Sequence, residues 1–322
     1  MGWWRWGGLL VPLAVIPPFL SDYPLYLLSW ALVFLIASIG LNLTLGYAGQ
    51  VSLAHAAFFG IGAYTTAILT NQGWSFWLAL PLGGLLACAF GFVLGFPALR
   101  VQDHYLAMVT LGFNIVVFVL LRNWSGLTGG VNGINPPRPT LGPLDLSGDL
   151  AFYYVILVVA FAAILLADWV VRSKWGRAFR AMRENELAAA VHGVNLRNYK
   201  VLAFALGALY AGIGGGLFGA LLGYIDPEAF HLTRTLEFLI VVVVGGLGRF
   251  AGPFLGTLVV TLLPEVLRPF GNLYLVVYAG LVLVMMLFLR KGLVVLLDGL
   301  VSIAYRLGKA CGQILHHGAS GD

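Results

Sequence analysis

Polar side chains gather at a break in an otherwise apolar stretch, the segment GYAGQVSLAH at residues 46–55. Gln50, Ser52 and His55 lie within the break, and Asn42 comes just before it. Amide, hydroxyl and imidazole groups can exchange hydrogen bonds with a small polar solute. If the stretch crosses a membrane, irregular backbone persists there only against protein or a water-filled cavity. The pattern therefore favours the lining of a translocation path, with an ordinary interfacial turn packed through glycine as the alternative.

Two more polar residues, Thr110 and Asn114, lie four positions apart in an apolar segment and hence on one face of a helix. They could line the same path, but polar residues in membrane helices often serve only as contacts between helices, and we prefer that interpretation. Glu237 and Glu265 are carboxylates at or within apolar segments. An intramembrane carboxylate is a candidate for proton coupling, although each lies near a predicted helix end from which it can reach the membrane interface.

The composition indicates what kind of protein must position these residues. Of the 322 residues, 60% are apolar and 10% are charged, whereas about a quarter of the residues in soluble domains are charged. A soluble fold needs more polar surface than this sequence supplies, and lipid removes that need. The net charge of +5 fits basic loops on one side of a membrane. Because no basic patch is interleaved with exposed aromatic residues, we predict a membrane protein that contacts lipid and binds no nucleic acid.

The sequence lacks the common catalytic motifs. It has no G-x-x-x-x-G-K-[ST] loop for nucleotide phosphates, no H-E-x-x-H zinc motif and no G-x-S-x-G nucleophile motif. The two cysteines, Cys88 and Cys311, form neither a disulfide framework nor a metal site. We therefore expect no enzyme activity, no bound metal and no cofactor in this chain.

Apolar segments follow one another along almost the whole chain. They lie near residues 8–20, 24–45, 54–70, 75–97, 104–121, 151–171, 201–222, 236–247, 253–267 and 272–289. A membrane span needs about 20 apolar residues. The segments 236–247 and 253–267 are short and separated by glycines, so they are two short spans or one broken helix. We predict an all-α, polytopic transmembrane bundle of eight to ten helices, with ten favoured, that contains broken or re-entrant helices.

The distribution of Lys and Arg gives this bundle an orientation, because cytoplasmic loops are enriched in both residues. Starting the ten helices from the cytoplasm puts most of the basic residues inside. Those left outside are Arg122, Arg138, Arg234 and Arg268. Residues 172–200 then form a cytoplasmic loop, and residues 122–150, rich in glycine and proline, form an external one. Both termini are cytoplasmic in this arrangement.

The loop at 172–200 differs from the external loop because its sequence is compatible with a helix. Leu187, Ala190 and Val191 fall on one helical stripe, and Gly193 is well placed to end the helix. A solvated loop that carries positive charge is the simplest interpretation. The second is a short amphipathic helix that docks on a cytoplasmic partner.

With these features in place, the sequence resembles a known family, the M-type (LivM-like) permease subunits of branched-chain amino-acid ABC importers. The resemblance covers residues 30–295 and rests on six blocks of sequence. They are LNLTLGYAGQVSLAHAAFFGIGAY at 41–64, FPALRVQDHYLAMVTLGFN at 96–114, LTGGVNGI at 127–134, SKWGRAFRAMRENELAAAVHGVNLRNYKVLAF at 173–204, YIDPEAF at 224–230 and VVVVGGLGRFAGPFLGTLVVTLLPEVLR at 241–268.

The resemblance implies that the chain is one permease subunit of an ATP-driven importer in the bacterial inner membrane. A second, related permease subunit would complete the path, and two ATP-binding subunits would bind below, with ATP and Mg held in those subunits. A periplasmic substrate-binding protein would deliver branched-chain amino acids or related small polar solutes. The loop at 172–200 resembles the family's EAA-type loop, whose helix docks into a groove on the ATPase. The residues that this assigns to ATPase coupling are Arg183, Glu184, Glu186, Ala188, Ala189 and Gly193.

Our candidates for the substrate path are Asn42, Gln50, Ser52, His55, Thr110 and Asn114. We expect one permease domain over residues 1–310 and a flexible cytoplasmic tail over 311–322. The competing hypothesis is a secondary transporter or channel that works alone, with Glu237 or Glu265 as its coupling carboxylate. A transporter of that kind has no need of a docking helix, so the loop at 172–200 separates the two hypotheses.

Overall fold

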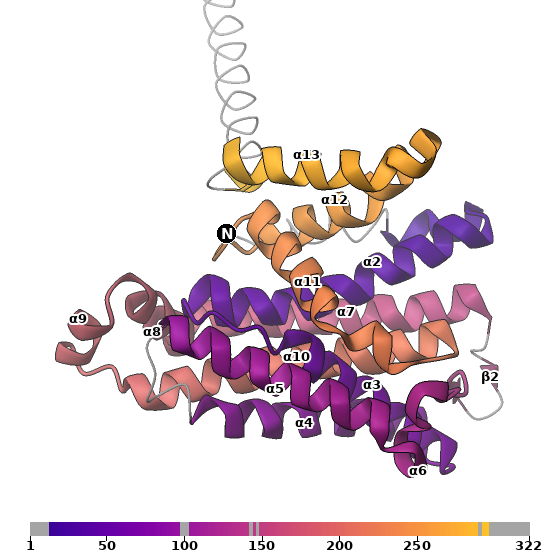
Figure 1. Ribbon diagram of the computed structural model, residues 1–322, viewed down its shortest axis with the longest axis horizontal. Coiled ribbons are helices and arrows are strands. Elements are labelled where there is room, and N and C mark those ends of the chain that lie inside the picture. The colour runs from indigo at the N-terminus through magenta and orange to yellow at the C-terminus, as the bar shows by residue number, and fades with distance from the viewer. Residues whose placement is uncertain (1–12, 97–102, 142–143, 146–147, 289–291, 296–322) are drawn as a thin grey trace, which may run out of the picture.

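The computed structural model describes residues 13–96, 103–141, 144–145, 148–288 and 292–295. These residues form a bundle of helices, most of which run in one common direction (Figure 1). The long helices are α2 (Asp22–Leu41), α3 (His55–Asn71), α4 (Phe76–Gly95), α5 (Asp103–Asn123), α7 (Asp149–Arg172), α10 (Leu196–Leu222), α11 (Leu232–Gly245), α12 (Gly252–Leu267) and α13 (Tyr274–Phe288). The predicted all-α membrane bundle is confirmed.

Within the described residues, five helical stretches are long and apolar enough to cross a membrane. They are Asp22–Tyr47, Phe76–Gly95, Tyr105–Asn123, Asp149–Arg172 and Leu196–Leu222. The helices α3, α11, α12 and α13 are shorter. Residues 8–12 of the first predicted segment, and the whole predicted tail at 311–322, lie outside the described residues. In the described rest of that segment, residues 13–15 are helical and the short turn η1 (Pro17–Phe19) follows them.

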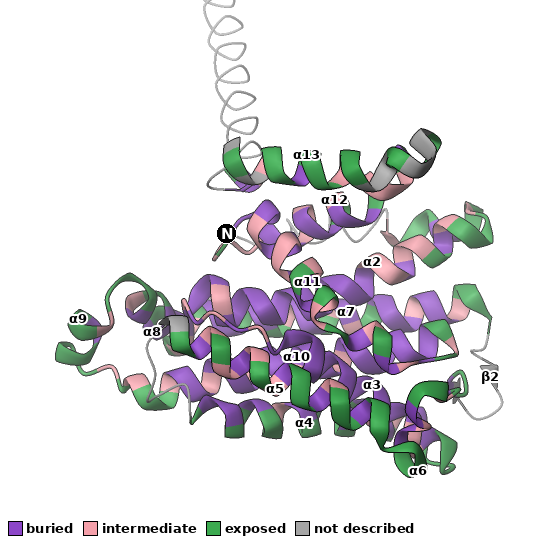
Figure 2. Ribbon diagram, viewed as in Figure 1, coloured by how far each residue is buried: buried purple, intermediate pink, exposed green. Residues whose placement is uncertain are grey.

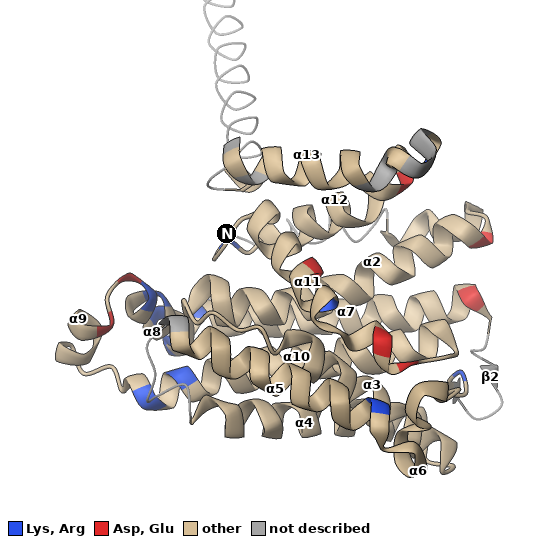
Figure 3. Ribbon diagram, viewed as in Figure 1, with Lys and Arg blue, Asp and Glu red and all other residues tan. Residues whose placement is uncertain are grey.

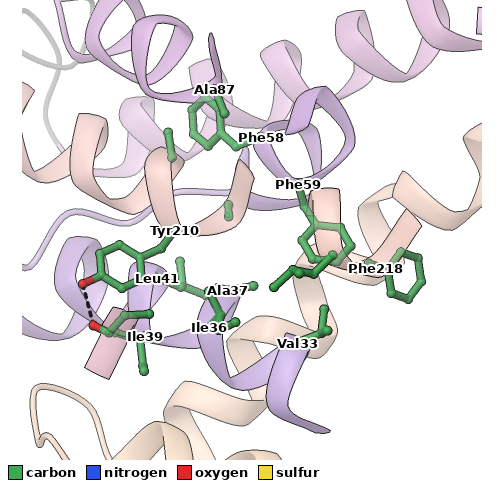
Figure 4. Packing of buried hydrophobic residues seen from close by; sticks show 14 of the residues in the cluster. Val33, Ile36, Ala37, Ile39, Leu41, Phe58, Phe59, Ala87, Tyr210 and Phe218 are labelled. Carbon is green, nitrogen blue, oxygen red and sulfur yellow. Dashed lines mark hydrogen bonds between the residues drawn. The ribbon is translucent and has the colours of Figure 1, made fainter. Parts of the chain in front are cut away.

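Helix α10 forms the centre of the bundle, where it packs against α2, α3 and α4 and is mostly buried (Figure 2). Small residues allow this close packing: a Cβ atom on Gly62 of α3 would collide with the backbone of Gly212 on α10. Aromatic rings fill the remaining space, with the Phe59 and Phe218 ring centroids 5.1 Å apart (Figure 4). The Tyr210 hydroxyl donates a hydrogen bond to the Ala163 carbonyl, which joins α10 to α7.

Both predicted breaks are present, but they differ in form. Helix α2 continues into a π-helical turn, η2 (Asn42–Tyr47), after which residues 48–54 form non-helical chain before α3 begins at His55. The glycine-rich break at 246–251 is instead a tight turn between α11 and α12. These two helices pack side by side, since a Cβ atom on Gly256 would meet the backbone of Val241. The segments 236–247 and 253–267 are therefore two short helices and not one broken helix.

The two long polar connections lie at opposite ends of the bundle. The one after α5 contains α6 (Ser125–Thr128), η4 (Gly130–Asn132) and a two-stranded hairpin, β1 (Thr140–Leu141) with β2 (Leu144–Asp145). It is tied to the chain after α10 by backbone pairing of Ile134 with Ile225. The other connection forms α8 (Lys174–Glu184) and α9 (Glu186–Val191). Lys and Arg gather at the α8–α9 end, whereas most acidic residues lie toward the opposite end (Figure 3).

Candidate functional site

The connection between α7 and α10 folds into two short helices because it contains three good capping residues. The Ser173 hydroxyl accepts a hydrogen bond from the Trp175 backbone nitrogen at the start of α8. Asn185 adopts an extended backbone that ends α8, and its side chain accepts from the Ala188 nitrogen to start α9. Gly193 ends α9 with a φ of 82°, which glycine adopts at little cost. The predicted helix end at Gly193 is confirmed, but the break at Asn185 was not foreseen.

Helix α9 presents two large apolar side chains to its surroundings. Leu187 is 80% exposed and Val191 is 86% exposed, four positions apart and hence on one face. Glu184 and Ala188 are also exposed, while Ala189 is buried beneath the helix. The helix therefore buries Ala189 and leaves an apolar face without a partner in the described chain. A face of this kind suits docking into a groove.

Arg183, near the end of α8, reaches both breaks in the bundle. Its guanidinium donates a hydrogen bond to the Gly46 carbonyl in the π-helical turn and lies against Gly248 in the α11–α12 turn. Asn42 joins the same two segments: its side-chain amide donates to the Arg249 carbonyl at 3.0 Å and its oxygen accepts from the Gly248 nitrogen at 2.9 Å. Arg183 and Asn42 therefore join the two breaks to each other, and Arg183 also joins them to α8.

A second contact links the loop to α10 and to the non-helical chain. The Lys200 ammonium lies 2.7 Å from a carboxylate oxygen of Glu186, and the Gln50 amide nitrogen lies 3.4 Å from that carboxylate. Gln50 is buried, and its side-chain oxygen has no hydrogen-bond partner in the described part of the chain. We call the contacts of Arg183, Glu186, Lys200 and Gln50 the loop junction.

The other end of the non-helical chain is held by neutral side chains from α5 and α11. Thr110 accepts from the Leu53 nitrogen at 2.9 Å, and the Asn114 amide donates to the Leu53 carbonyl at 3.1 Å. The Thr235 hydroxyl accepts from the Ala56 nitrogen at 3.0 Å and also lies 3.1 Å from the Asn114 amide. We call these contacts the midspan junction, because Asn114 lies near the middle of α5. They satisfy backbone groups that unwinding would leave unpaired in lipid.

The remaining candidates for the path also contact backbone. The His55 ring nitrogen Nε2 lies 2.8 Å from the Ala37 carbonyl of α2, and the Ser52 hydroxyl accepts from the Ala54 nitrogen at 3.4 Å. Both side chains are buried. The structure thus brings all six predicted path residues to the two breaks and their supports: Asn42, Gln50, Ser52, His55, Thr110 and Asn114.

Each of the two carboxylates in the apolar segments, Glu237 and Glu265, forms an ion pair with an arginine at a nearby position of the chain. Glu265 lies at the end of α12, where it contacts Arg268 at 3.3 Å and accepts from the Tyr23 hydroxyl at 2.6 Å. Glu237 lies 2.7 Å from Arg234 in α11. The sequence had placed Arg234 outside the membrane, and that was wrong: its guanidinium lies 5.4 Å from the ring centroid of Phe34, near the middle of the Asp22–Tyr47 span.

Three residues of this site were not among the sequence candidates. Thr235 lies in an apolar helix and gave no signal except its polarity, and its partners are more than a hundred positions away. Lys200 resembled an ordinary positive charge in a cytoplasmic loop. Gly248 was recognised as part of a break, but its contacts with Arg183 and Asn42 depend on how α11 and α12 pack.

Comparison with known proteins agrees with this architecture. Residues 23–289 match the family described as the permease component of the branched-chain amino acid transport system. The chain is 34% identical to the high-affinity branched-chain amino acid transport system permease protein LivM of Escherichia coli K12, over 88% of this chain and 73% of that protein. It is 26% identical to LivH of the same strain, over 70% of this chain and 79% of that protein.

An archaeal relative also matches, the probable branched-chain amino acid transport permease protein LivM of Methanocaldococcus jannaschii, with 26% identity over 72% of this chain and 77% of that protein. No solved structure matches the chain significantly. The family match covers most of the chain and includes both breaks, both junctions and the α8–α9 loop. The chain belongs to the family of permease components of branched-chain amino acid transport systems.

Proposed function

We propose that this chain is one of two permease subunits of an ATP-driven importer for branched-chain amino acids, and that α9 is the helix on which an ATPase subunit docks. The observation that carries the proposal is the α8–α9 loop. It presents Leu187 and Val191 outward. Its Arg183 contacts the backbone of both breaks, and its Glu186 contacts the Gln50 side chain next to the first break. A docking face and a mechanical connection to the bundle interior thus occur on one loop, residues 173–195 between α7 and α10.

The second permease subunit is supported by the comparisons. The chain resembles both LivM and LivH of one E. coli strain, and both names refer to a high-affinity branched-chain amino acid transport system. Two related permeases in one system would face each other across the path. The ATPase subunits would carry ATP and Mg, and a periplasmic binding protein would deliver the solute. The basic α8–α9 end (Figure 3) is then cytoplasmic by the positive-inside rule. In the same arrangement we expect both termini on the cytoplasmic side.

The mechanism follows from differential affinity. A nucleotide drives a conformational change only if it binds one state of the assembly better than the other. Closure of the ATPase dimer would move α9, and Arg183 would pull on the Gly46 carbonyl and the α11–α12 turn. The non-helical chain at 48–54 is the element that can change shape, because no helical ladder holds it. Access would switch from one side of the membrane to the other.

The docking helix can be tested with Leu187→Asp and Val191→Asp in the complete transporter. Both side chains are exposed and without a partner among the described residues, so the variants should insert and fold normally. We expect the ATPase subunits to be lost on purification and ATP-driven uptake of leucine to fall at least about tenfold, since a desolvated charge in an apolar groove costs several kcal/mol. Val131→Asp, 64% exposed at the opposite end of the molecule, is the matched control.

Normal ATPase binding and normal uptake in both α9 variants would overturn the docking role. The importer itself is tested separately, with an ATPase partner that binds ATP but cannot hydrolyse it. Leucine uptake that persists with that partner would instead favour a transporter working alone. The pairing of Glu237 and Glu265 with arginines does not favour that alternative, because a coupling carboxylate has to take up and release a proton.

A further inference from the structure

The ion pair of Arg234 and Glu237 lies at an unusual depth. Arg234 precedes Thr235, whose hydroxyl contacts Asn114 near the middle of α5. Its guanidinium packs against three aromatic rings, with the carbon Cζ 5.8 Å from the ring centroid of Trp30 and 5.6 Å from that of Phe218. The pair therefore lies within the span and not at the membrane surface. Charges at this depth are costly and face a water-filled path or a protein partner.

The pair is also partly exposed. The Arg234 side chain is 19% exposed and the Glu237 side chain is 34% exposed. Lipid is an unsuitable neighbour for this exposed part, because a charge in hydrocarbon loses its hydration without compensation. In an assembly of two permeases, a face with exposed charge at midspan belongs beside the path.

Both partners keep unused hydrogen-bonding capacity. The Arg234 Nε donates to the Ala229 carbonyl at 3.1 Å, and Nη1 donates to Glu237 Oε2. Within the described chain, Nη2 of Arg234 and Oε1 of Glu237 have no further partner. A guanidinium binds carboxylate strongly through its free edge, and a free carboxylate oxygen accepts from an ammonium group. One cationic and one anionic group therefore stand side by side, each with a free edge.

We propose that Arg234 and Glu237 bind the backbone of an amino acid in transit, Arg234 the α-carboxylate and Glu237 the α-ammonium. An amino acid carries these two charges on one carbon, so a neighbouring pair of opposite charges matches both at once. The zwitterion adds no net charge to the pair, which keeps the cost of crossing the span low. Trp30, partly exposed beside the guanidinium, offers an apolar wall for the aliphatic side chain. This inference rests on the proposed function and names the contacts that would select the substrate class.

The test uses the complete transporter in proteoliposomes with the variants Glu237→Gln, Arg234→Gln and the double variant. Leucine uptake and the ATP hydrolysis stimulated by the binding protein are measured on the same preparations. We expect each single variant to lower uptake at least about tenfold, because one charge-assisted contact to the solute is lost, while stimulated hydrolysis stays within about twofold of wild type. The double variant leaves no unpaired charge in the span, so it should assemble normally and still fail to import leucine.

Glu265→Gln and Arg268→Gln are the matched controls, since they remove a pair of the same spacing at the end of α12. They should leave uptake unchanged. Wild-type uptake in the double variant would overturn the inference. So would an equal fall of uptake and hydrolysis together with loss of assembly, which a purely structural pair would give. ATP-dependent uptake by the wild type, measured alongside, shows whether the proposed function holds independently of this pair.

Discussion

The non-helical chain at 48–54 is held at one end by charged groups and at the other by neutral ones. At the loop junction, Arg183 and the Lys200–Glu186 pair make the contacts, close to water. At the midspan junction, threonine hydroxyls and the Asn114 amide make them, deep in the bundle. At these two junctions the difference follows the cost of burial: neutral hydrogen bonds hold the deep end of the segment, and the charged contacts lie where solvent offsets their desolvation. The first junction is suited to moving and the second to staying in place.

The largest expected effect comes from Arg183→Ala, which removes the connection between α8 and the two breaks. A hydrogen bond to a charged group contributes about 1.5–3 kcal/mol, so leucine imported per ATP hydrolysed should fall about 10- to 100-fold. The measurement is paired uptake and hydrolysis in proteoliposomes. Arg177→Ala is the control on the same helix, because among the described residues the Arg177 guanidinium makes only a long hydrogen bond of 3.4 Å, to the Arg172 carbonyl. An unchanged ratio for Arg183→Ala would mean that the loop junction transmits nothing.

The next effect concerns stability at the midspan junction. Thr235→Val keeps the shape of the side chain but leaves the Ala56 nitrogen without its acceptor. We expect unfolding in detergent to require about 1–2 kcal/mol less free energy, with the ratio of uptake to hydrolysis unchanged. Thr70→Val is the control, since among the described residues the Thr70 hydroxyl donates only to carbonyls of its own helix. A fall in that ratio without loss of stability would remove the distinction between the two junctions.

The smallest effect is the coupling energy between Lys200 and Glu186, measured by a double-mutant cycle of Lys200→Met and Glu186→Gln. The Glu186 side chain is 38% exposed, so solvent screening limits the coupling to about 0.5–1 kcal/mol. Raising the salt concentration to about 1 M should reduce it further. Salt should leave the effect of Thr235→Val unchanged, because that contact involves no charge. An equal response to salt at both junctions would contradict the comparison.

The sequence predicted the bundle and its breaks because local signals carried them. Apolar runs fixed the helices, glycines at 46–49 and 245–248 marked the breaks, and Gly193 marked the end of α9. The contacts that join these parts depend on packing between distant segments. Thr44 hydrogen-bonds to the carbonyl of Ala203, 159 positions away, and no pattern near either residue indicates it.

The position of Arg234 also depends on packing that the local sequence does not indicate. An arginine at the edge of an apolar run usually lies at the membrane surface, and the rule that assigns charges to loops placed it there. In the fold, α11 starts near the middle of the span, because the chain before it turns inward through η5 (Pro227–Phe230) and packs Phe230 against Phe59. Only the position of that turn reveals that the arginine lies beside aromatic rings within the span.

The π-helical turn at Asn42–Tyr47 also has a consequence for how relatives are aligned. A π-helical turn holds one residue more than an α-helical turn of the same rise. A relative that continues α2 as a regular helix has to be one residue shorter between the positions of Leu41 and Ala48, or every side chain after the turn rotates by about 100°. A gap of one residue at this position would therefore divide the family into two groups. Members without the gap keep the Asn42 contact to the α11–α12 turn. Members with the gap must hold that turn through other contacts.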